Sequence, residues 1–175
     1  MAANTVFITL GSNIAPETNL PLAVQHLAGR VALRAVSRVY QTAPIDAQGQ
    51  IARDQGYFLN AAILAETDLS PADLKRVLRA IEAELGRQRS ADKFAPRPID
   101  LDLALFDDLV LDDPASGLTL PDPDILKWAH IALPLADLAP EHPHPMTGET
   151  LRAIAARFEG TPGVTVRDDV RLNAG

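Results

Sequence analysis

The stretch RQRSADKFAPRPIDLDLALF, residues 87–106, decides the fold of this chain. Its first half is basic and contains Pro96 and Pro98, which disfavour a helix, so this half is predicted to be a loop. Its second half, Ile99–Phe106, alternates with the period of a β-strand. The alternation places Ile99, Leu101, Leu103 and Leu105 on one face and Asp100, Asp102, Ala104 and Phe106 on the other.

Asp100 and Asp102 are the unusual pair on this strand, with Cα atoms about 6.5 Å apart at roughly 3.3 Å rise per residue. Two like charges on an apolar strand repel each other and resist burial, so a compensating cation is expected. A pair of Mg²⁺ ions fits, because Mg²⁺ takes one or two carboxylates and completes its shell with water and phosphate oxygens. Arg87 and Arg97 of the adjacent loop could close over a polyphosphate. The alternative is a half-exposed strand with a solvated polar face.

The composition excludes several classes of protein. The chain has 175 residues, of which 47% are hydrophobic and 22% charged, as expected for one soluble domain. Its net charge of −7 disfavours nucleic-acid binding, and the lack of cysteine excludes disulfides and thiolate metal sites. Neither a signal peptide nor a long apolar run is visible, so no membrane partner and a cytoplasmic location are expected.

The elements are expected in the order strand, helix, strand, strand, helix, strand. The expected ranges are strand 5–10, helix 19–28 capped by Asn19, strands 35–42 and 57–67, a helix from the Ser70 cap to Gly86, and strand 99–106. A turn at 107–108 is expected to lead into a hairpin strand at 109–111. Short helices are expected at 125–132 and 151–158.

This order predicts an α+β fold of the ferredoxin-like split β-α-β type. Its core would be a mainly antiparallel four-stranded sheet with two helices on one face, plus a C-terminal helical extension. We expect one domain over residues 1–175, with a core at about 5–158. The tail, 160–175, is expected either to add an edge strand or to be loosely ordered. The open face of the sheet would carry the site.

Three further features have both a structural and a functional interpretation. Asn60 is an amide in an apolar strand and must bond to backbone or to a ligand; Phe58 on the same face favours a flat heterocycle. The turn Gly11–Asn13 could cradle a phosphate or simply reverse the chain. His142 and His144 have the spacing of metal ligands but lie in a proline-rich loop without a third ligand, which favours a plain loop.

The chain resembles the 6-hydroxymethyl-7,8-dihydropterin pyrophosphokinases, enzymes of folate biosynthesis, from about Phe7 to Phe158. The resemblance is carried by GSN (11–13), Y-x-T-x-P (40–44), F-L-N-A-A (58–62), G-R-x-R (86–89) and P-R-x-I-D-L-D-L-x-L-F (96–106). It implies a ferredoxin-like fold and transfer of the β,γ-diphosphoryl group of ATP to the hydroxymethyl oxygen of the pterin, with release of AMP. It also implies two Mg²⁺ ions as cofactors and ATP and hydroxymethyldihydropterin as the small-molecule partners.

The resemblance also implies roles for individual residues. Asp100 and Asp102 match the metal-binding aspartates, and Arg87 and Arg97 match loop arginines that reach the phosphates; these four are the expected catalytic residues. The expected ATP contacts are Glu82, Arg87, Arg97, Thr119 and Asp122. The expected pterin contacts are Thr42, Ala43, Phe58, Asn60, Phe94 and His130.

The sequence departs from the family pattern at a few positions. Phe94 and Ala95 stand where the family usually has Trp and Gly, and Asp122 and Trp128 stand where it has His and Arg. These departures motivate an alternative, a non-catalytic or altered pterin- or nucleotide-binding relative. A phosphatase of the D-x-D type is disfavoured, because its motif ends the first strand, whereas here the motif lies in mid-chain. A monomer is expected.

Overall fold

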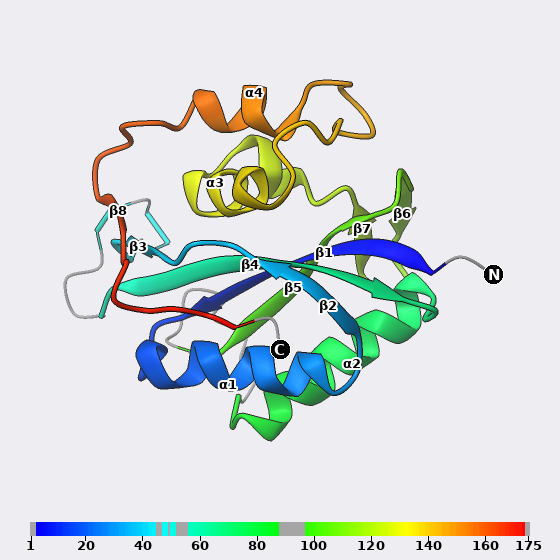
Figure 1. Ribbon diagram of the computed structural model, residues 1–175, viewed down its shortest axis with the longest axis horizontal. Helices are drawn as coiled ribbons and strands as arrows, with labels where there is room; N and C mark the ends of the chain where they lie inside the picture. Colours follow the sequence, from blue (N-terminus) through cyan, green and yellow to red (C-terminus); the bar gives the residue numbers. More distant parts are fainter. Residues whose placement is uncertain (1–2, 45–46, 49, 52–55, 88–96, 174–175) are drawn as a thin grey trace.

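The computed structural model describes residues 3–44, 47, 48, 50, 51, 56–87 and 97–173. From Asn4 to Phe106 the elements follow the order strand, helix, three strands, helix, strand, and further short strands and helices come after them (Figure 1). The elements are β1 (Asn4–Ser12), α1 (Pro16–Ala28), β2 (Ala32–Val36), β3 (Tyr40–Thr42), β4 (Phe58–Thr67), α2 (Pro71–Glu84), β5 (Asp100–Phe106), β6 (Leu111–Asp113), β7 (Leu118–Leu120), the 3₁₀ helix η1 (Pro123–Leu126), α3 (Ala129–Leu138), α4 (Leu151–Ala156) and β8 (Val164–Val166).

The first strand, β1, lies inside the main sheet, between β4 and β5, and is antiparallel to both. The strand order is β5-β1-β4-β3-β8, with β2 also paired to β4, so the described residues form a six-stranded sheet rather than the expected four-stranded one. The additional strands arise because the expected strand 35–42 is divided into β2 and β3, and because the tail supplies β8. The α+β class and the antiparallel sheet are confirmed.

The division between β2 and β3 is caused by Ser37. Its backbone N–H donates to the carbonyl of Ala62 at 2.9 Å, while its hydroxyl accepts from the N–H of Ala62 at 2.8 Å. A side chain thus replaces one rung of the backbone ladder, and the register shifts just before it, between Leu33 and Ala35.

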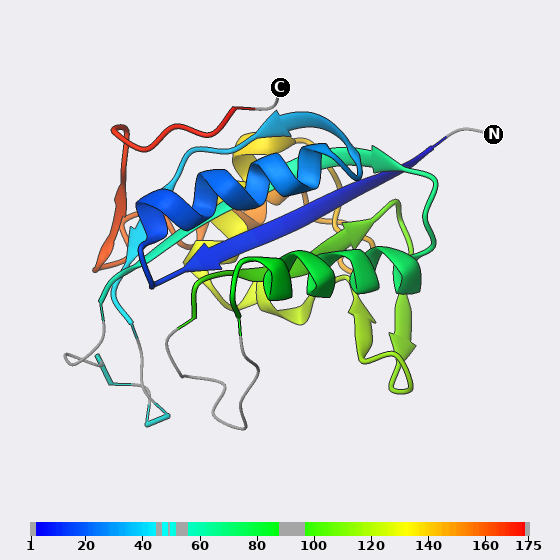
Figure 2. The ribbon, with the colours of Figure 1, turned by 90° about the horizontal axis from the view of Figure 1, so that it is seen from below.

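Helices cover both faces of the sheet, as Figure 1 shows. Helices α1 and α2 lie side by side on one face (Figure 2) and bury a core that includes Leu20, Leu27, Leu74 and Ile81. Helices α3 and α4 cover part of the other face through a second core that includes Leu135 and Ile154. The expectation of an open second face was therefore wrong, because α3 packs across β4. Within the described ranges, no helix is long and apolar enough to cross a membrane.

Helix α2 begins as predicted, since the Ser70 hydroxyl accepts from the N–H of Asp73 at 3.1 Å. The prediction for α1 was wrong by one turn. This helix begins at Pro16, after Ala15 in the left-handed conformation (φ 42°), and Asn19 lies inside it. The Asn19 amide donates to the carbonyl of Ile14 at 2.6 Å, so it stabilises the first turn from within rather than as the cap.

A bulge in β5 breaks the alternation of the decisive strand. Phe7 pairs with Leu105 and the next residue, Ile8, with Leu103, so Ala104 is the extra residue. Leu105 therefore packs under α3, and Phe106 packs on the α1/α2 side, which is the reverse of the expected assignment for these two residues. Asp100 and Asp102 precede the bulge and keep their expected face.

The elements after β5 differ from the prediction in their pairing. Asp107 follows β5 with a positive φ of 47°, but the next strand, β6, pairs with β7 and not with β5. The expected helix 125–132 is replaced by η1 and then α3, which contains Pro134 and continues to Leu138. The tail adds the edge strand β8 beside β3, which confirms the first of its two alternatives.

Candidate active site

A row of residues crosses three strands at the end of the sheet near the predicted site. Asn60 on β4 and Asp100 on β5 both pair with Gly11 on β1. Directly paired residues share a face, and neighbouring strands lie about 4.8 Å apart, so the backbones at Asn60 and Asp100 are about 10 Å apart on one face. Asp102 lies on the next rung of this face, opposite Thr9.

Gly11 leaves the space between these two side chains open. A Cβ atom at this position would come to 3.3 Å from the Oδ1 atom of Asn60. That is tighter than an ordinary van der Waals contact, so any larger residue would displace the amide. Sequence reasoning interpreted Gly11 as part of a turn; the structure places it inside β1, as the floor of the site.

The expected pterin contacts on β3 and β4 lie together at one end of the row. The buried Asn60 amide donates to the hydroxyl of Thr42 at 2.9 Å, which fixes the orientation of the amide. Thr42 pairs with Phe58, which is half-buried, and Ala43 follows directly. Phe94 lies outside the described residues.

At the other end of the row, arginines compensate Asp100. Its Oδ1 atom lies 2.7 Å from Nη1 of Arg87, and its Oδ2 atom lies 3.2 Å from Nη1 of Arg97. Both side chains are mostly enclosed, with exposed fractions of 12% and 16%. For Asp100, the arginines thus supply the positive charge that sequence reasoning required beside the aspartates.

The turn that follows β1, beginning at Asn13, has a structural role in this arrangement. The Asn13 side chain accepts from the backbone N–H of Arg97 at 2.7 Å, and the N–H of Asn13 donates to the Arg97 carbonyl at 3.2 Å. The turn therefore fixes the backbone of Arg97 beside the row.

Glu82 is buried behind the arginines, with 2% exposure. Its Oε2 atom accepts from the backbone N–H of Leu101 at 2.9 Å and forms an ion pair with Arg87. Glu82 thus joins α2 to β5 and orients the arginine that meets Asp100. A direct contact with ATP remains a prediction for this residue.

A pocket of about 310 Å³ adjoins Asp100. Acidic side chains form one wall, and the expected ATP contact Thr119 lies in it; the acidic members are Asp100, Asp102, Asp122 and Asp124. The backbone N–H of Asp122 donates to the Ala104 carbonyl at 2.9 Å, so the loop after β7 is held against β5.

Two carboxylates of this wall, those of Asp102 and Asp122, have a raised pKa. Asp102 is exposed yet recessed among protein atoms, and this partial loss of water, together with the charges of Asp100 and Asp122, raises its pKa. Partial burial also raises the pKa of Asp122 to about 6, against the bond that its side chain accepts from the N–H of Asp124. A cation bound beside either carboxylate would lower its pKa, because a positive charge favours the ionised form.

The donor set of this wall fits magnesium rather than a softer metal, because it consists of carboxylate oxygens. The described residues contain no cluster of three or more acidic, histidine or cysteine side chains arranged to hold a metal.

His130 and Trp128 lie at the start of α3, with ring centroids 6.1 Å apart. Burial lowers the pKa of His130, which favours the neutral imidazole. A stacking contact of His130 with the pterin remains a prediction. The other histidines differ: the His142 ring packs 5.0 Å from that of Phe7, and Nδ1 of the buried His144 accepts from two backbone N–H groups, as expected of a plain structured loop.

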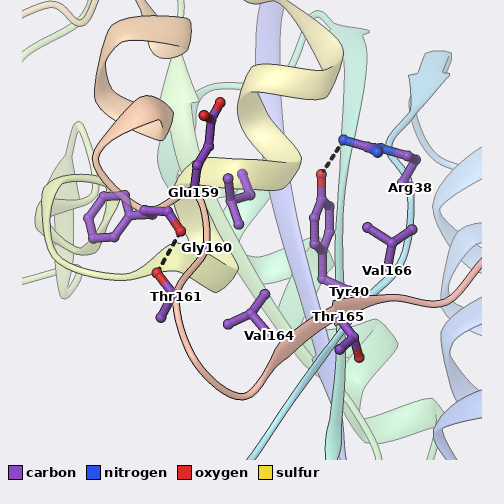
Figure 3. A pocket seen from close by; sticks show the side chains of 10 residues that line it. Arg38, Tyr40, Glu159, Gly160, Thr161, Val164, Thr165 and Val166 are labelled. Atoms are coloured by element: carbon purple, nitrogen blue, oxygen red, sulfur yellow. Dashed lines mark hydrogen bonds between the residues drawn. The ribbon is translucent and has the colours of Figure 1, made fainter.

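A second cavity, of about 240 Å³, lies between β3, β8 and the end of α4 (Figure 3). Two of its polar members already have a partner: Tyr40 donates to Asp137 at 2.8 Å, and Arg38 pairs with the same carboxylate at 3.0 Å. This arrangement ties α3 to β3 and contains none of the expected site residues.

Sequence reasoning missed three residues that line the acidic pocket. Asp124, Lys75 and Arg79 were not among the expected site residues, and all three line the pocket. The available signal for Lys75 and Arg79 was their spacing of four residues, which places both on the same side of the helix, next to the buried Leu74 and Leu78.

Comparisons with known proteins agree on the relatives of this chain. Residues 7–140 match the family model described as 7,8-dihydro-6-hydroxymethylpterin-pyrophosphokinase (HPPK). The 2-amino-4-hydroxy-6-hydroxymethyldihydropteridine pyrophosphokinase of Methylorubrum extorquens is 36% identical over 87% of this chain and 92% of that protein. The protein of the same name from Pseudomonas aeruginosa is 37% identical over 78% of this chain and 81% of that protein.

Other relatives are much longer than this chain. The folic acid synthesis protein FOL1 of Dictyostelium discoideum is 30% identical over 81% of this chain, but the match spans 20% of that protein. A Plasmodium falciparum HPPK-DHPS crystal structure with pteroate superimposes with a TM-score of 0.67 at 15% identity, covering 89% of this chain and 44% of that one. This last likeness supports the fold alone. The family model and the two bacterial relatives decide the assignment: the chain belongs to the 7,8-dihydro-6-hydroxymethylpterin-pyrophosphokinase family.

Proposed function

We propose that this pyrophosphokinase transfers the diphosphoryl group of ATP to the hydroxymethyl oxygen of 6-hydroxymethyl-7,8-dihydropterin, giving AMP and the pterin diphosphate. Family membership supports the activity and its place in folate biosynthesis. In the reaction, the hydroxymethyl oxygen forms a bond to the β-phosphorus. The bond from that phosphorus to the oxygen shared with the α-phosphate breaks, and AMP leaves.

The single observation that carries the proposal is the row Asn60–Gly11–Asp100. An amide suited to the edge of a flat heterocycle lies at one end, and the carboxylate and arginines suited to a metal–polyphosphate lie at the other. The residue between them has no side chain, and the span of about 10 Å suits one bicyclic ring with its reacting arm directed toward the phosphates.

On the pterin side, we propose contacts from Asn60, Phe58, Thr42 and Ala43, with His130 and Phe94 completing the site. Thr42 holds the Asn60 amide in a fixed orientation through the 2.9 Å bond, so the ring would be recognised by a preorganised group.

On the phosphate side, we propose that Asp100 and Asp102 hold two Mg²⁺ ions. Bound Mg²⁺ would neutralise the charge of the phosphate oxygens. Arg87 and Arg97 both lie within bonding distance of Asp100 in this structure. If the ions took over Asp100, both arginines could exchange that carboxylate for the phosphate oxygens. Thr119 and Asp122 would complete the nucleotide side, and Glu82 would keep Arg87 oriented.

The supporting experiment is a mass-resolved turnover assay with ATP, Mg²⁺ and the hydroxymethyl pterin. AMP together with a pterin diphosphate is the expected result. Formation of ADP would mean transfer of a single phosphoryl group and would overturn the mechanism. Binding of both substrates by calorimetry without any turnover would favour a binding protein instead.

The surrounding organisation is also proposed. The strand order β5-β1-β4-β3 supports a ferredoxin-like core with α3 and α4 as its extension, in one domain over residues 1–175. We propose a monomer acting in the cytoplasm. Analytical ultracentrifugation and fractionation of cells test these two points.

A further inference from the structure

The pocket beside Asp100 has a basic wall as well as an acidic one. Lys75 and Arg79 line it from α2, and the carboxylates of β5 and of the loop after β7 line it as well. They are four residues apart and therefore lie on the same side of the helix, one turn from each other. Leu78, which is buried between them in the sequence, lines the floor of the pocket.

Both cations lie close to Gly117, in the turn between β6 and β7. Its carbonyl accepts from the ammonium group of Lys75 at 2.5 Å. A Cβ atom on Gly117 would lie 3.4 Å from Nζ of Lys75 and 3.9 Å from Nη2 of Arg79. Both charged groups therefore approach one backbone position at the edge of the pocket. The positive φ of Gly117, 67°, further favours glycine there.

Arg79 differs from its neighbour Arg76 in whether an acidic side chain pairs with it. Arg76 forms an ion pair with Asp73 on the same helix, and its side chain is 74% exposed. Within the described ranges, no acidic side chain forms an ion pair with Arg79. Arg79, which lines the pocket, thus has no acidic partner among the described residues, whereas Arg76, which is not among the lining residues, has one.

We infer that Lys75 and Arg79 bind the anionic oxygens of the nucleotide in the pocket that the carboxylates also line. The inference rests on the proposed function and adds to it the residues that hold the leaving nucleotide. A polyphosphate alone would be repelled by the acidic wall, and a metal ion alone by the basic wall. A metal–nucleotide complex satisfies both walls at once, so the pocket selects that complex.

The test measures the affinity for an ATP analogue whose α,β-bridging oxygen is replaced by methylene, in the presence of Mg²⁺, by titration calorimetry. Methionine retains the apolar stem of a lysine or arginine and removes the charge. The double variant Lys75→Met/Arg79→Met is expected to bind the analogue about tenfold more weakly, with a shallower dependence of affinity on salt. Arg76→Met, on the same helix but outside the pocket, is the matched control and should change affinity less than twofold.

Further readouts separate charge from packing. The charge-preserving variant Lys75→Arg/Arg79→Lys should bind within about threefold of the wild type. Pterin affinity should be unchanged in every variant. The single variant Arg79→Met, at an exposed position, keeps the test valid if the double variant does not fold.

The outcomes distinguish the two levels of the proposal. A wild-type chain that turns over ATP, together with a double variant that binds the analogue as tightly, would overturn the inference and leave the proposed function standing. A wild-type chain that binds no analogue and makes no AMP would overturn both. An equal loss in Arg76→Met would show a general charge effect of α2 and would also overturn the inference.

Discussion

The buried carboxylate of Glu82 offers the sharpest test of how the site is supported. We predict that Glu82→Gln lowers the free energy of unfolding by about 3 kcal/mol. Breaking a buried ion pair costs about 3–5 kcal/mol, and a hydrogen bond to a charged group contributes about 1.5–3 kcal/mol. The lower end applies, because Arg87 keeps Asp100 as a partner and glutamine can still accept from the N–H of Leu101.

The assay is urea unfolding followed by far-ultraviolet circular dichroism, with the midpoint and the slope fitted separately. A loss of about 3 kcal/mol is large beside the roughly 5–15 kcal/mol typical of a domain. Glu84→Gln is the matched control. Glu84 lies two residues away, is 39% exposed and pairs with His26 and Arg30 on the surface, so its loss should cost less than about 1 kcal/mol.

A double-mutant cycle then isolates the pair. Glu82→Gln/Arg87→Met should be less destabilised than the sum of the single variants, by about 1–3 kcal/mol. The reasoning is refuted if Glu82→Gln costs no more than Glu84→Gln at unchanged slope, or if the cycle shows additivity within about 0.5 kcal/mol.

Three further predictions concern single positions. Asp102→Asn should abolish Mg²⁺-dependent AMP formation without lowering the melting temperature at pH 7.5. The melting temperature should hold because the pKa of this carboxyl group is raised in the folded chain, so its ionisation destabilises the fold progressively as pH rises above 3.8. Activity with normal Mg²⁺ dependence would contradict the metal assignment. Gly11→Ala should raise the KM for the pterin about tenfold in steady-state kinetics and leave the affinity for the ATP analogue unchanged. The reason is that the alanine Cβ would lie 3.3 Å from the Oδ1 atom of Asn60 and displace the amide. An unchanged KM would remove Gly11 from the site. Burial lowers the pKa of His144, so its contribution to stability is present above pH 6.5 and is lost as pH falls below that value. The variant His144→Asn keeps an acceptor for the two N–H groups and should lose less melting temperature than the wild type between pH 7 and 5. An equal slope of melting temperature against pH in both proteins would contradict this.

The sequence was most informative where local chemistry sets the structure. The Ser70 cap and the alternation of Phe58–Thr67 each follow from neighbouring residues, and both were predicted within a residue or two. The face of Asp100 and Asp102 followed from alternation alone. The family signature then assigned the expected roles, and those assignments remain to be tested by the variants above.

What the sequence could not show depends on distant partners. The bulge at Ala104 exists because β5 must match β1, nearly a hundred residues earlier. The break at Ser37 depends on a bond to Ala62, and the start of α1 depends on a left-handed Ala15, which no local preference favours. Lys75 and Arg79 acquire a shared surface only once the β6–β7 turn lies beside α2.

The central place of β1 has a consequence for how the chain is made. Its partners are β4 and β5, so Val6 can pair on both sides only after Ala65 and Phe106 have been synthesised. At roughly 5–20 residues per second, the apolar segment emerges from the ribosome many seconds before its second neighbour exists. The pairing is also strongly non-local, which slows folding relative to chains with local contacts. The strand that supplies the floor of the site is thus translated before either of its partners and cannot be fully paired until β5 has been made.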